Sequence, residues 1–257
     1  MRAAVTMPLY RVHAIVLRRM DLGETDRVLR LLTREAGRLS AIAKGARRPT
    51  SRFAGATEPF TASRMLLATG KTFQIVSQCE MDQAFPNLRQ DLEGIARAAY
   101  LCELVERLTD EQEPLPVLFD LLMETLKLLD AARMDRDAVV HMFELKLLAE
   151  RGYEPQVSRC VECGASVEGS GLGFSASMGG ALCRRHRYGA QDAVPIRATT
   201  LHCMAEMLAL APDPACGLQL PPETLKDLER CLRSYIAWHT EPTLRTAEFL
   251  QILRSAP

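Results

Sequence analysis

The spacing of apolar residues changes once along this chain, near Pro86, and that change limits the possible folds more than any other feature. Before it, Tyr10, Val12, Ala14 and Val16 occupy alternate positions, and two later segments behave in the same way. An apolar period of two is typical of half-buried strands, and glycines between the segments mark turns. About five strands in roughly 70 residues suit a small closed barrel. We predict such a barrel over residues 8–82; an OB-fold is one solution, and the period alone does not separate it from an SH3-like barrel.

After Pro86 the apolar residues recur every three or four positions, which is the period of amphipathic helices. The first such stripe consists of Leu88, Leu92, Ile95, Ala99, Cys102, Val105 and Leu108. Further stripes follow at residues 118–129 and 139–147, and helices are also expected near 198–210, 223–238 and 243–254. The sequence therefore predicts an α+β multidomain chain. It comprises a flexible tail at 1–7, the barrel, and an α-helical domain over 83–257 that is interrupted at 157–190.

Three of the eight cysteines form a regular pattern with a histidine. Cys160 and Cys163 are followed by Cys183 and His186, and two residues separate the members of each pair. This spacing lets a tight turn point both side chains at one ion, and tetrahedral Zn²⁺ accepts three cysteines and one histidine. Four protein ligands leave no open position, so we expect one structural zinc in a ribbon or knuckle at 157–190. The alternatives are ordinary buried cysteines beside a chance histidine or, with less support, a redox pair.

Charge is distributed unevenly, although the 32 Lys and Arg equal the 32 Asp and Glu in number. Residues 1–80 contain 14 basic and 6 acidic side chains, a net charge of +8, and residues 81–155 contain 8 and 16, a net charge of −8. This asymmetry predicts a basic barrel surface for a polyanion and an acidic surface beyond it. The chain shows neither an export signal nor a long apolar run, which predicts a protein of the reducing cytoplasm with metal-bound cysteines.

Several blocks of the sequence resemble the RecO family in their order and spacing. Residues 23–26 (GETD), 32–37 (LTREAG) and 44–48 (KGARR) lie in the predicted barrel. Residues 143–148 (FELKLL), 152–155 (GYEP), 160–164 (CVECG) and 179–183 (GGALC) surround the cysteines, and 244–250 (LRTAEFL) lie near the C-terminus. Each block alone is weakly specific, but together they span about residues 8–253. One departure is His186, where many zinc-bearing members of the family place cysteine.

The resemblance implies an OB-fold barrel, a helical domain and an embedded zinc ribbon. It also implies a recombination mediator in DNA repair, rather than an enzyme, that binds single- and double-stranded DNA and anneals complementary strands. Together with RecR, such a protein helps to load RecA onto DNA coated by single-stranded DNA-binding protein (SSB). RecR and the C-terminal tail of SSB would be direct partners, RecA an indirect one, and no membrane would be involved. The expected location is the nucleoid in the cytoplasm.

The candidate DNA-binding residues are cations of the predicted barrel. They comprise four residues of one loop and four residues at a strand end or at other turns: Lys44, Arg47, Arg48, Arg52, Arg18, Arg19, Arg38 and Lys71. Long cationic side chains on loops can follow phosphates without reading bases, so binding should be salt-sensitive and tolerant of sequence. Phe53 and Phe60 flank the loop and could stack bases, but packing in the core is the favoured interpretation.

Signals for an enzyme are weak in this sequence. Gly70, Lys71 and Thr72 lack the upstream glycine of a phosphate-binding loop, because Met65 occupies that position. Two rival classes of function remain open. A zinc hydrolase would need an open metal position. A zinc-containing RNA-binding or transcriptional adaptor would share the basic barrel and would differ in its preference for RNA over DNA.

Overall fold

The computed structural model describes residues 8–53, 55–131, 135–210 and 219–240, together with Leu244, Thr246, Ala247 and Leu250. The predicted tail at 1–7, most of the predicted helix at 243–254 and Cys216 lie outside the described residues. By its internal contacts the chain divides into two compact units. The N-terminal unit comprises Met1–Asp130 and Phe249–Pro257, and the C-terminal unit comprises Ala131–Glu248. Each unit is considered by itself.

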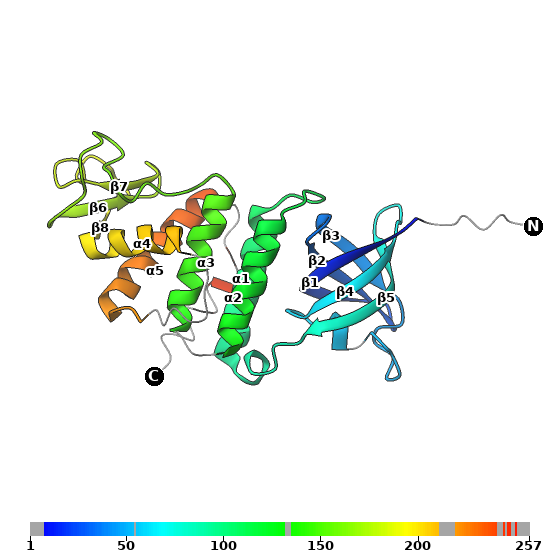
Figure 1. The fold of residues 1–257 in the computed structure, drawn as a ribbon. Helices are drawn as coiled ribbons and strands as arrows, with labels where there is room; N and C mark the ends of the chain where they lie inside the picture. Colours follow the sequence, from blue (N-terminus) through cyan, green and yellow to red (C-terminus); the bar gives the residue numbers. More distant parts are fainter. Residues whose placement is uncertain are drawn as a thin grey trace, which may run out of the picture. The chain divides into compact units, whose positions relative to one another are not determined.

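Five strands of the N-terminal unit close into a barrel in the order β1-β2-β3-β5-β4. They are β1 (Leu9–Leu22), β2 (Asp26–Thr33), β3 (Gly37–Ala43), β4 (Ala62–Ala68) and β5 (Gln74–Gln83) (Figure 1). Neighbouring strands are antiparallel except β3 and β5, which pair in parallel through Ala41 with Gln74 and Ile42 with Ile75. This order is that of an OB-fold, so the predicted barrel is confirmed and the SH3-like alternative is not.

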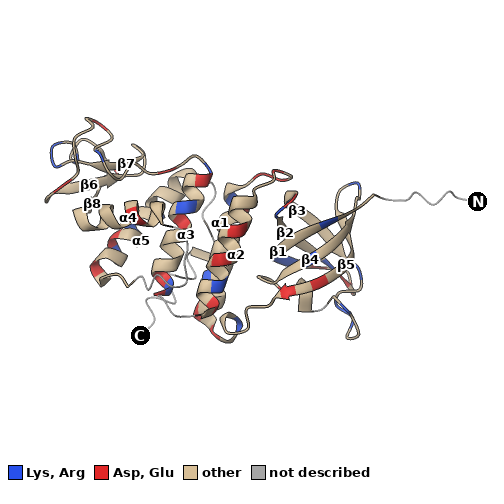
Figure 2. Ribbon diagram, viewed as in Figure 1, with Lys and Arg blue, Asp and Glu red and all other residues tan. Residues whose placement is uncertain are grey.

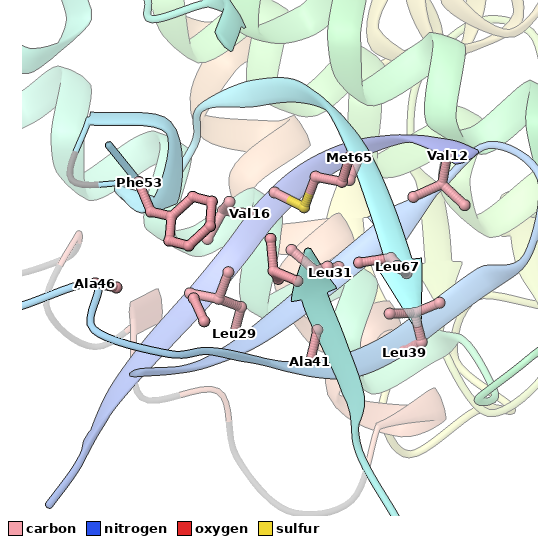
Figure 3. Close-up of a cluster of buried hydrophobic side chains, with 13 residues drawn as sticks. Val12, Val16, Leu29, Leu31, Leu39, Ala41, Ala46, Phe53, Met65 and Leu67 are labelled. Atoms are coloured by element: carbon pink, nitrogen blue, oxygen red, sulfur yellow. The ribbon is translucent and has the colours of Figure 1, made fainter. Parts of the chain in front are cut away.

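Alternating residues of the strands fill the barrel core (Figure 3). Val12, Ala14 and Val16 of β1 point inward with Leu29 and Leu31 of β2, as the period of two predicts. The ring of Phe53 enters the same core from the chain that follows β3 and is only 7% exposed. Phe60 is buried to the same extent. Core packing is therefore the correct interpretation of both rings, and neither offers a face for stacking a base.

Two α-helices follow the barrel in the N-terminal part of the chain, α1 (Leu92–Leu108) and α2 (Pro116–Ala131). Asp91 caps α1 by accepting a hydrogen bond from the backbone N–H of Glu93 at 3.0 Å. The predicted stripe was wrong at the start of α1, where Leu92 is 57% exposed and Gly94 is buried instead. A Cβ at Gly94 would lie 2.9 Å from the carbonyl oxygen of Leu88, so the helix approaches the preceding turn through its glycine rather than through a large side chain.

The C-terminal unit contains three described helices and a small sheet. The helices are α3 (Arg136–Glu150), α4 (Ala198–Ala209) and α5 (Pro222–His239). The sheet has the order β7-β6-β8, from β6 (Leu172–Ser175), β7 (Gly180–Leu182) and β8 (Val194–Ile196). Asp227 of α5 is buried and accepts hydrogen bonds from Arg197 and Thr200 at the start of α4, which ties these two helices together. No helix among the described residues is both long and apolar enough to cross a membrane.

Candidate metal centre and nucleic-acid interface

The two cysteine-containing turns bring four potential metal ligands together beside the small sheet. The donor atoms of Cys160, Cys163, Cys183 and His186 all lie within 4.8 Å of one another. Nδ1 of His186 is 3.6 Å from Sγ of Cys160 and 3.5 Å from Sγ of Cys183, and the sulfurs of Cys163 and Cys183 are 4.0 Å apart. A tetrahedral zinc with bonds of about 2.0–2.3 Å separates its donors by roughly 3.5–3.8 Å. The four side chains therefore fit around one metal ion.

Backbone turns explain why this sequence presents its ligands in pairs. The N–H of Gly164 donates to the carbonyl of Cys160 at 2.8 Å, and Gly164 has a φ of +71°, which favours glycine. The N–H of His186 donates to the carbonyl of Cys183 at 3.0 Å in the second turn. The two halves meet at Gly180, where a Cβ would lie only 2.2 Å from the carbonyl oxygen of Gln156. A glycine is thus required for the chain before Cys160 to approach β7.

The surroundings of Cys160 favour the deprotonated, negatively charged form of its sulfur. Burial alone would raise the pKa of this thiol, but the backbone N–H groups of Cys183, Cys163 and Glu162 and the ring of His186 outweigh burial and lower the pKa to about 6. A thiolate is the form of cysteine that binds a metal. The N–H of Ala165 lowers the pKa of Cys163, but burial and the neighbouring sulfurs of Cys160 and Cys183 outweigh it and raise that pKa. The close approach of the four donor atoms, rather than their titration, is what favours metal binding over the interpretation of these cysteines as ordinary apolar residues.

The loop after β3 carries four of the eight predicted DNA-binding cations and is held against the β1–β2 turn. Oδ1 of Asp26 accepts hydrogen bonds from the N–H of Gly45 at 2.8 Å and from the hydroxyl of Thr25 at 2.9 Å. Arg47 donates its backbone N–H to the carbonyl of Thr25 at 2.9 Å and its guanidinium to the carbonyl of Gly23 at 2.7 Å. We call this set of bonds the turn clamp. The Gly45 N–H, followed by the Thr25 hydroxyl, lowers the pKa of Asp26.

The other three cations of this loop, Lys44, Arg48 and Arg52, are exposed. Within the described part of the chain, no carboxylate lies within ion-pair distance of any of them. Lys44 and Arg48 do lie close enough to Asp26 to contribute to its lowered pKa. The guanidinium of Arg52 lies 5.4 Å from the ring centroid of Phe53, whose side chain is anchored in the core. We call Lys44, Arg48 and Arg52 the loop cations.

Three further predicted residues are paired with carboxylates or carbonyl groups of the protein itself. Arg18 lies 3.4 Å from Glu106 of α1, and Arg19 pairs with Glu58. Arg38 donates to the carbonyl of Thr109 at 2.9 and 3.2 Å and lies 3.6 Å from Glu111.

Two arginines that the sequence analysis did not single out behave in the same way. Arg30 reaches Glu111 at 2.6 Å, and Arg34 reaches Asp120 at 2.8 Å. The excess of acidic residues after residue 80 therefore serves in part to neutralise the barrel within the N-terminal unit. The opposite charges of residues 1–80 and 81–155 hinted at this neutralisation, but they did not indicate which residues would pair.

Lys71, the last of the eight predicted residues, lies away from the loop. It is in the turn between β4 and β5, where the N–H of Thr69 donates to the carbonyl of Pro8 just before β1. The turn clamp adjoins the other end of β1. The two turns are thus at opposite ends of the barrel, as the blue segments of Figure 2 indicate. The structure brings together the four loop residues and does not bring Arg18, Arg38 or Lys71 to them.

These features define a class of protein: an OB-type barrel with a cationic loop, followed by helices that carry a three-cysteine, one-histidine cluster. The family model for "Recombination protein O N terminal" matches residues 7–85, and the model for "Recombination protein O C terminal" matches residues 89–248. The chain belongs to the RecO family. This confirms the resemblance seen in the sequence and indicates a role in DNA repair.

Individual relatives agree with this membership along the whole chain. The chain is 42% identical over 252 residues to the DNA repair protein RecO of Pelotomaculum thermopropionicum, with 98% of this chain and 97% of the relative covered. It is 36% identical over 252 residues to the DNA repair protein RecO of Symbiobacterium thermophilum, with 97% and 100% covered.

Proposed function

We propose that this protein is a non-enzymatic recombination mediator that binds single- and double-stranded DNA and anneals complementary strands. Together with RecR, it would help to load RecA onto single-stranded DNA that is coated by SSB, in the nucleoid of the cytoplasm. The observation that carries the DNA-binding part is the group of loop cations, which are exposed and lack carboxylate partners among the described residues. The direct contacts with RecR and with the SSB tail, and the indirect one with RecA, rest on family membership alone.

Within the predicted DNA-binding set, we assign the phosphate contacts to Lys44, Arg48 and Arg52. Arg47 has its main role in the turn clamp, because its guanidinium already binds the carbonyl of Gly23 and lies 3.4 Å from Asp21. An arginine that is held by a carboxylate loses that pairing when it binds a phosphate, so Arg18, Arg19 and Arg38 should contribute less. Lys71 would contact only DNA that extends along the barrel.

Phosphate binding of this kind suits strand annealing. Cations that neutralise the backbone remove the repulsion between two strands without occupying the edges of the bases. The bases then stay available for pairing with a complementary strand. The burial of Phe53 and Phe60 fits this mechanism, because neither ring competes for a base.

We further propose that the cluster of Cys160, Cys163, Cys183 and His186 binds one structural zinc ion. A zinc ion there would link the two turns and supply no catalytic chemistry, because four protein ligands leave no position for a substrate or water. The test is the metal content of wild type and of Cys183→Ser, combined with hydrogen exchange. We expect the variant to lose zinc and to lose protection over residues 157–196, while the barrel is unaffected. Equal protection in both proteins would contradict a structural metal.

The experiment that tests the main proposal is annealing of complementary oligonucleotides, bare and SSB-coated, by the triple variant Lys44→Ala/Arg48→Ala/Arg52→Ala. Arg47 is left intact so that the turn clamp survives. The control is Lys226→Ala/Arg233→Ala, which removes two exposed cations of α5. We expect annealing to fall at least tenfold in the triple variant only.

Two results would contradict the proposal. Annealing by the triple variant at the wild-type rate would mean that the loop cations are not the binding element. Faster annealing of RNA than of DNA by the wild type would instead favour an RNA-binding adaptor.

A further inference from the structure

A second group of cations lies in the C-terminal unit, in the chain that begins at Cys183. Residues 183–188 read CRRHRY, so three arginines and a tyrosine surround His186. Arg184 and Arg185 are exposed, and Tyr188 is 78% exposed, the highest value among the large hydrophobic side chains described. Figure 2 shows basic segments in the loops around β6 and β7. The proposed zinc site needs only Cys183 and His186 from this segment, so it does not account for the other four side chains.

Two glycines of the neighbouring chain make room for the arginines. A Cβ at Gly171, which has a φ of +80°, would lie 3.2 Å from Cγ of Arg184. A Cβ at Gly173 in β6 would lie 2.9 Å from Cβ of Arg187. The aliphatic stems of both arginines therefore pack over glycine backbone. This packing limits how the stems can lie, so the guanidinium groups have a preferred direction.

Two carboxylates of this region are hydrogen-bonded to serines. Asp192 accepts hydrogen bonds from the hydroxyls of Ser175 and Ser177, and Glu168 accepts one from Ser166 at 2.7 Å. No carboxylate of the described residues lies within ion-pair distance of Arg184, Arg185 or Arg187. Three thiolates with one divalent ion would carry a single negative charge. The positive charge is therefore local, confined to the three neighbouring arginines of residues 184–187, which have no described carboxylate at ion-pair distance.

Tyr188 adds a feature that a simple charged patch lacks. The guanidinium carbon of Arg187 lies 4.6 Å from the centroid of the Tyr188 ring, an arrangement that holds the ring by a cation–π contact. The large exposure of this ring means that much of it remains open to solvent. A held, exposed aromatic ring among cations is the arrangement on which unpaired bases stack in single-strand binding proteins.

We infer that Arg184, Arg185, Arg187 and Tyr188 form a second nucleic-acid contact that binds a single DNA strand, through its phosphates and one stacked base. We call these four residues the knuckle surface. The inference rests on the proposed annealing function, because annealing requires two strands to be held by one protein. The loop cations of the N-terminal unit would hold one strand, and the knuckle surface of the C-terminal unit would hold the other. A duplex would fit the knuckle surface less well, because its bases are already stacked and paired.

The test measures binding of fluorescent oligo(dT) over a series of salt concentrations. The variant is Arg184→Ala/Arg185→Ala, which leaves the ring contact of Arg187 in place, and the control is again Lys226→Ala/Arg233→Ala. The slope of log affinity against log salt should fall by about 1.4 in the variant, because each lost phosphate contact on a single strand removes about 0.7. Zinc content is measured for every variant to show that the knuckle remains folded.

The stacked base is tested separately with Tyr188→Ala and Tyr188→Phe. Affinity for oligo(dT) should fall roughly tenfold in Tyr188→Ala and stay near wild type in Tyr188→Phe. An abasic strand of the same length should bind wild type and Tyr188→Ala equally well. If Tyr188→Ala binds oligo(dT) as tightly as wild type does, the stacking part of the inference is wrong.

These experiments test the knuckle surface and the loop cations separately, so either assignment can be refuted without the other. Wild-type binding by Arg184→Ala/Arg185→Ala, together with weak binding by the triple loop variant, would overturn the knuckle surface and leave the proposed function standing. The opposite result would remove the loop from the proposed function and support the knuckle surface. Wild-type binding by both variants would contradict both ideas.

Discussion

Two sets of cations in the N-terminal unit have the same chemistry but differ in their partners: one set is paired within the protein and the other is exposed. Arg30, Arg34 and Arg38 on or beside the strands meet Glu111, Asp120 and the carbonyl of Thr109, which follow more than 70 residues later in the chain. Among the described residues, the loop cations Lys44, Arg48 and Arg52 have no carboxylate at ion-pair distance, and Asp26 acts on Lys44 and Arg48 only from farther away. A surplus of positive charge therefore does not by itself identify a nucleic-acid surface. The cations that remain after the protein's own anions are paired do identify a candidate.

The largest expected effect is a loss of DNA affinity when the loop cations are removed. In Lys44→Ala/Arg48→Ala/Arg52→Ala, the affinity for single-stranded DNA at about 0.1 M salt should fall by roughly 100-fold, and the salt slope should fall by about 2. The free energy of unfolding should stay within about 0.5 kcal/mol of wild type, since these side chains are exposed. Fluorescence anisotropy and urea unfolding measure the two quantities. A large loss of stability without loss of affinity would reverse the assignment.

The next largest effect is expected for Arg38, whose removal should reduce stability rather than DNA affinity. The variant Arg38→Ala removes the guanidinium that donates hydrogen bonds to the carbonyl of Thr109, a buried residue. Because that carbonyl then lacks its donor, the free energy of unfolding should fall by about 1–3 kcal/mol. Affinity for DNA should change less than threefold. Arg48→Ala is the matched control and should show the reverse pattern in the same two measurements. If Arg38→Ala weakened DNA binding as strongly as Arg48→Ala, the distinction between the two sets would fail.

A smaller effect is expected from the acidic partner. Glu111 reaches both Arg30 and Arg38 but is half exposed, so Glu111→Gln should cost no more than about 1 kcal/mol of unfolding free energy. DNA affinity should not increase, because Arg38 remains largely covered and bonded to Thr109. The measurement is urea unfolding together with DNA titration at low salt. A marked gain in affinity would show that Arg30 and Arg38 are masked DNA ligands.

The smallest effect concerns pH and the turn clamp. The pKa of Asp26 is lowered, first by the N–H of Gly45 and then by the hydroxyl of Thr25. A lowered pKa in the folded protein means that the clamp contributes its full stability above the ordinary aspartate pKa of about 3.9 and loses it as the pH falls through the lower folded value. Between pH 5 and 8 this contribution should therefore be constant.

The carboxyl carbon of Asp26, followed by NMR, should titrate below the ordinary aspartate value. Asp26→Asn serves as the control that removes the titrating group while keeping an oxygen for Gly45. A midpoint at or above the ordinary value would contradict the clamp as described.

Local patterns were sufficient to predict most of the fold and the metal cluster. The alternation at Tyr10–Val16 predicted β1, and the barrel follows from it and from the strands after it. The two CxxC-like spacings predicted which four side chains would meet, because each pair is set by a turn of a few residues. The predicted domain boundaries and the role of each cation remain predictions. These properties depend on contacts between distant parts of the chain.

Contacts between residues that lie far apart in the chain could not be predicted from local patterns. Nothing near Arg38 indicates Thr109, and nothing near Arg34 indicates Asp120. The start of α1 was misjudged for a related reason. Leu92 fits the helical period, but the close approach of Gly94 to Leu88 turns the buried face away from it. A periodic pattern gives the period of a helix and leaves its rotation to tertiary packing.

The basic loop is fastened at both ends. Gly45 and Arg47 are bonded to the β1–β2 turn, and the ring of Phe53 is embedded in the barrel core. Only the short stretch between these anchors is free to vary in length or composition. Natural variation or engineering could therefore exchange, add or remove charges between residues 48 and 52 while the barrel keeps its hydrogen bonds and its packing. The affinity for a polyanion could thus be changed without changing the stability of the fold.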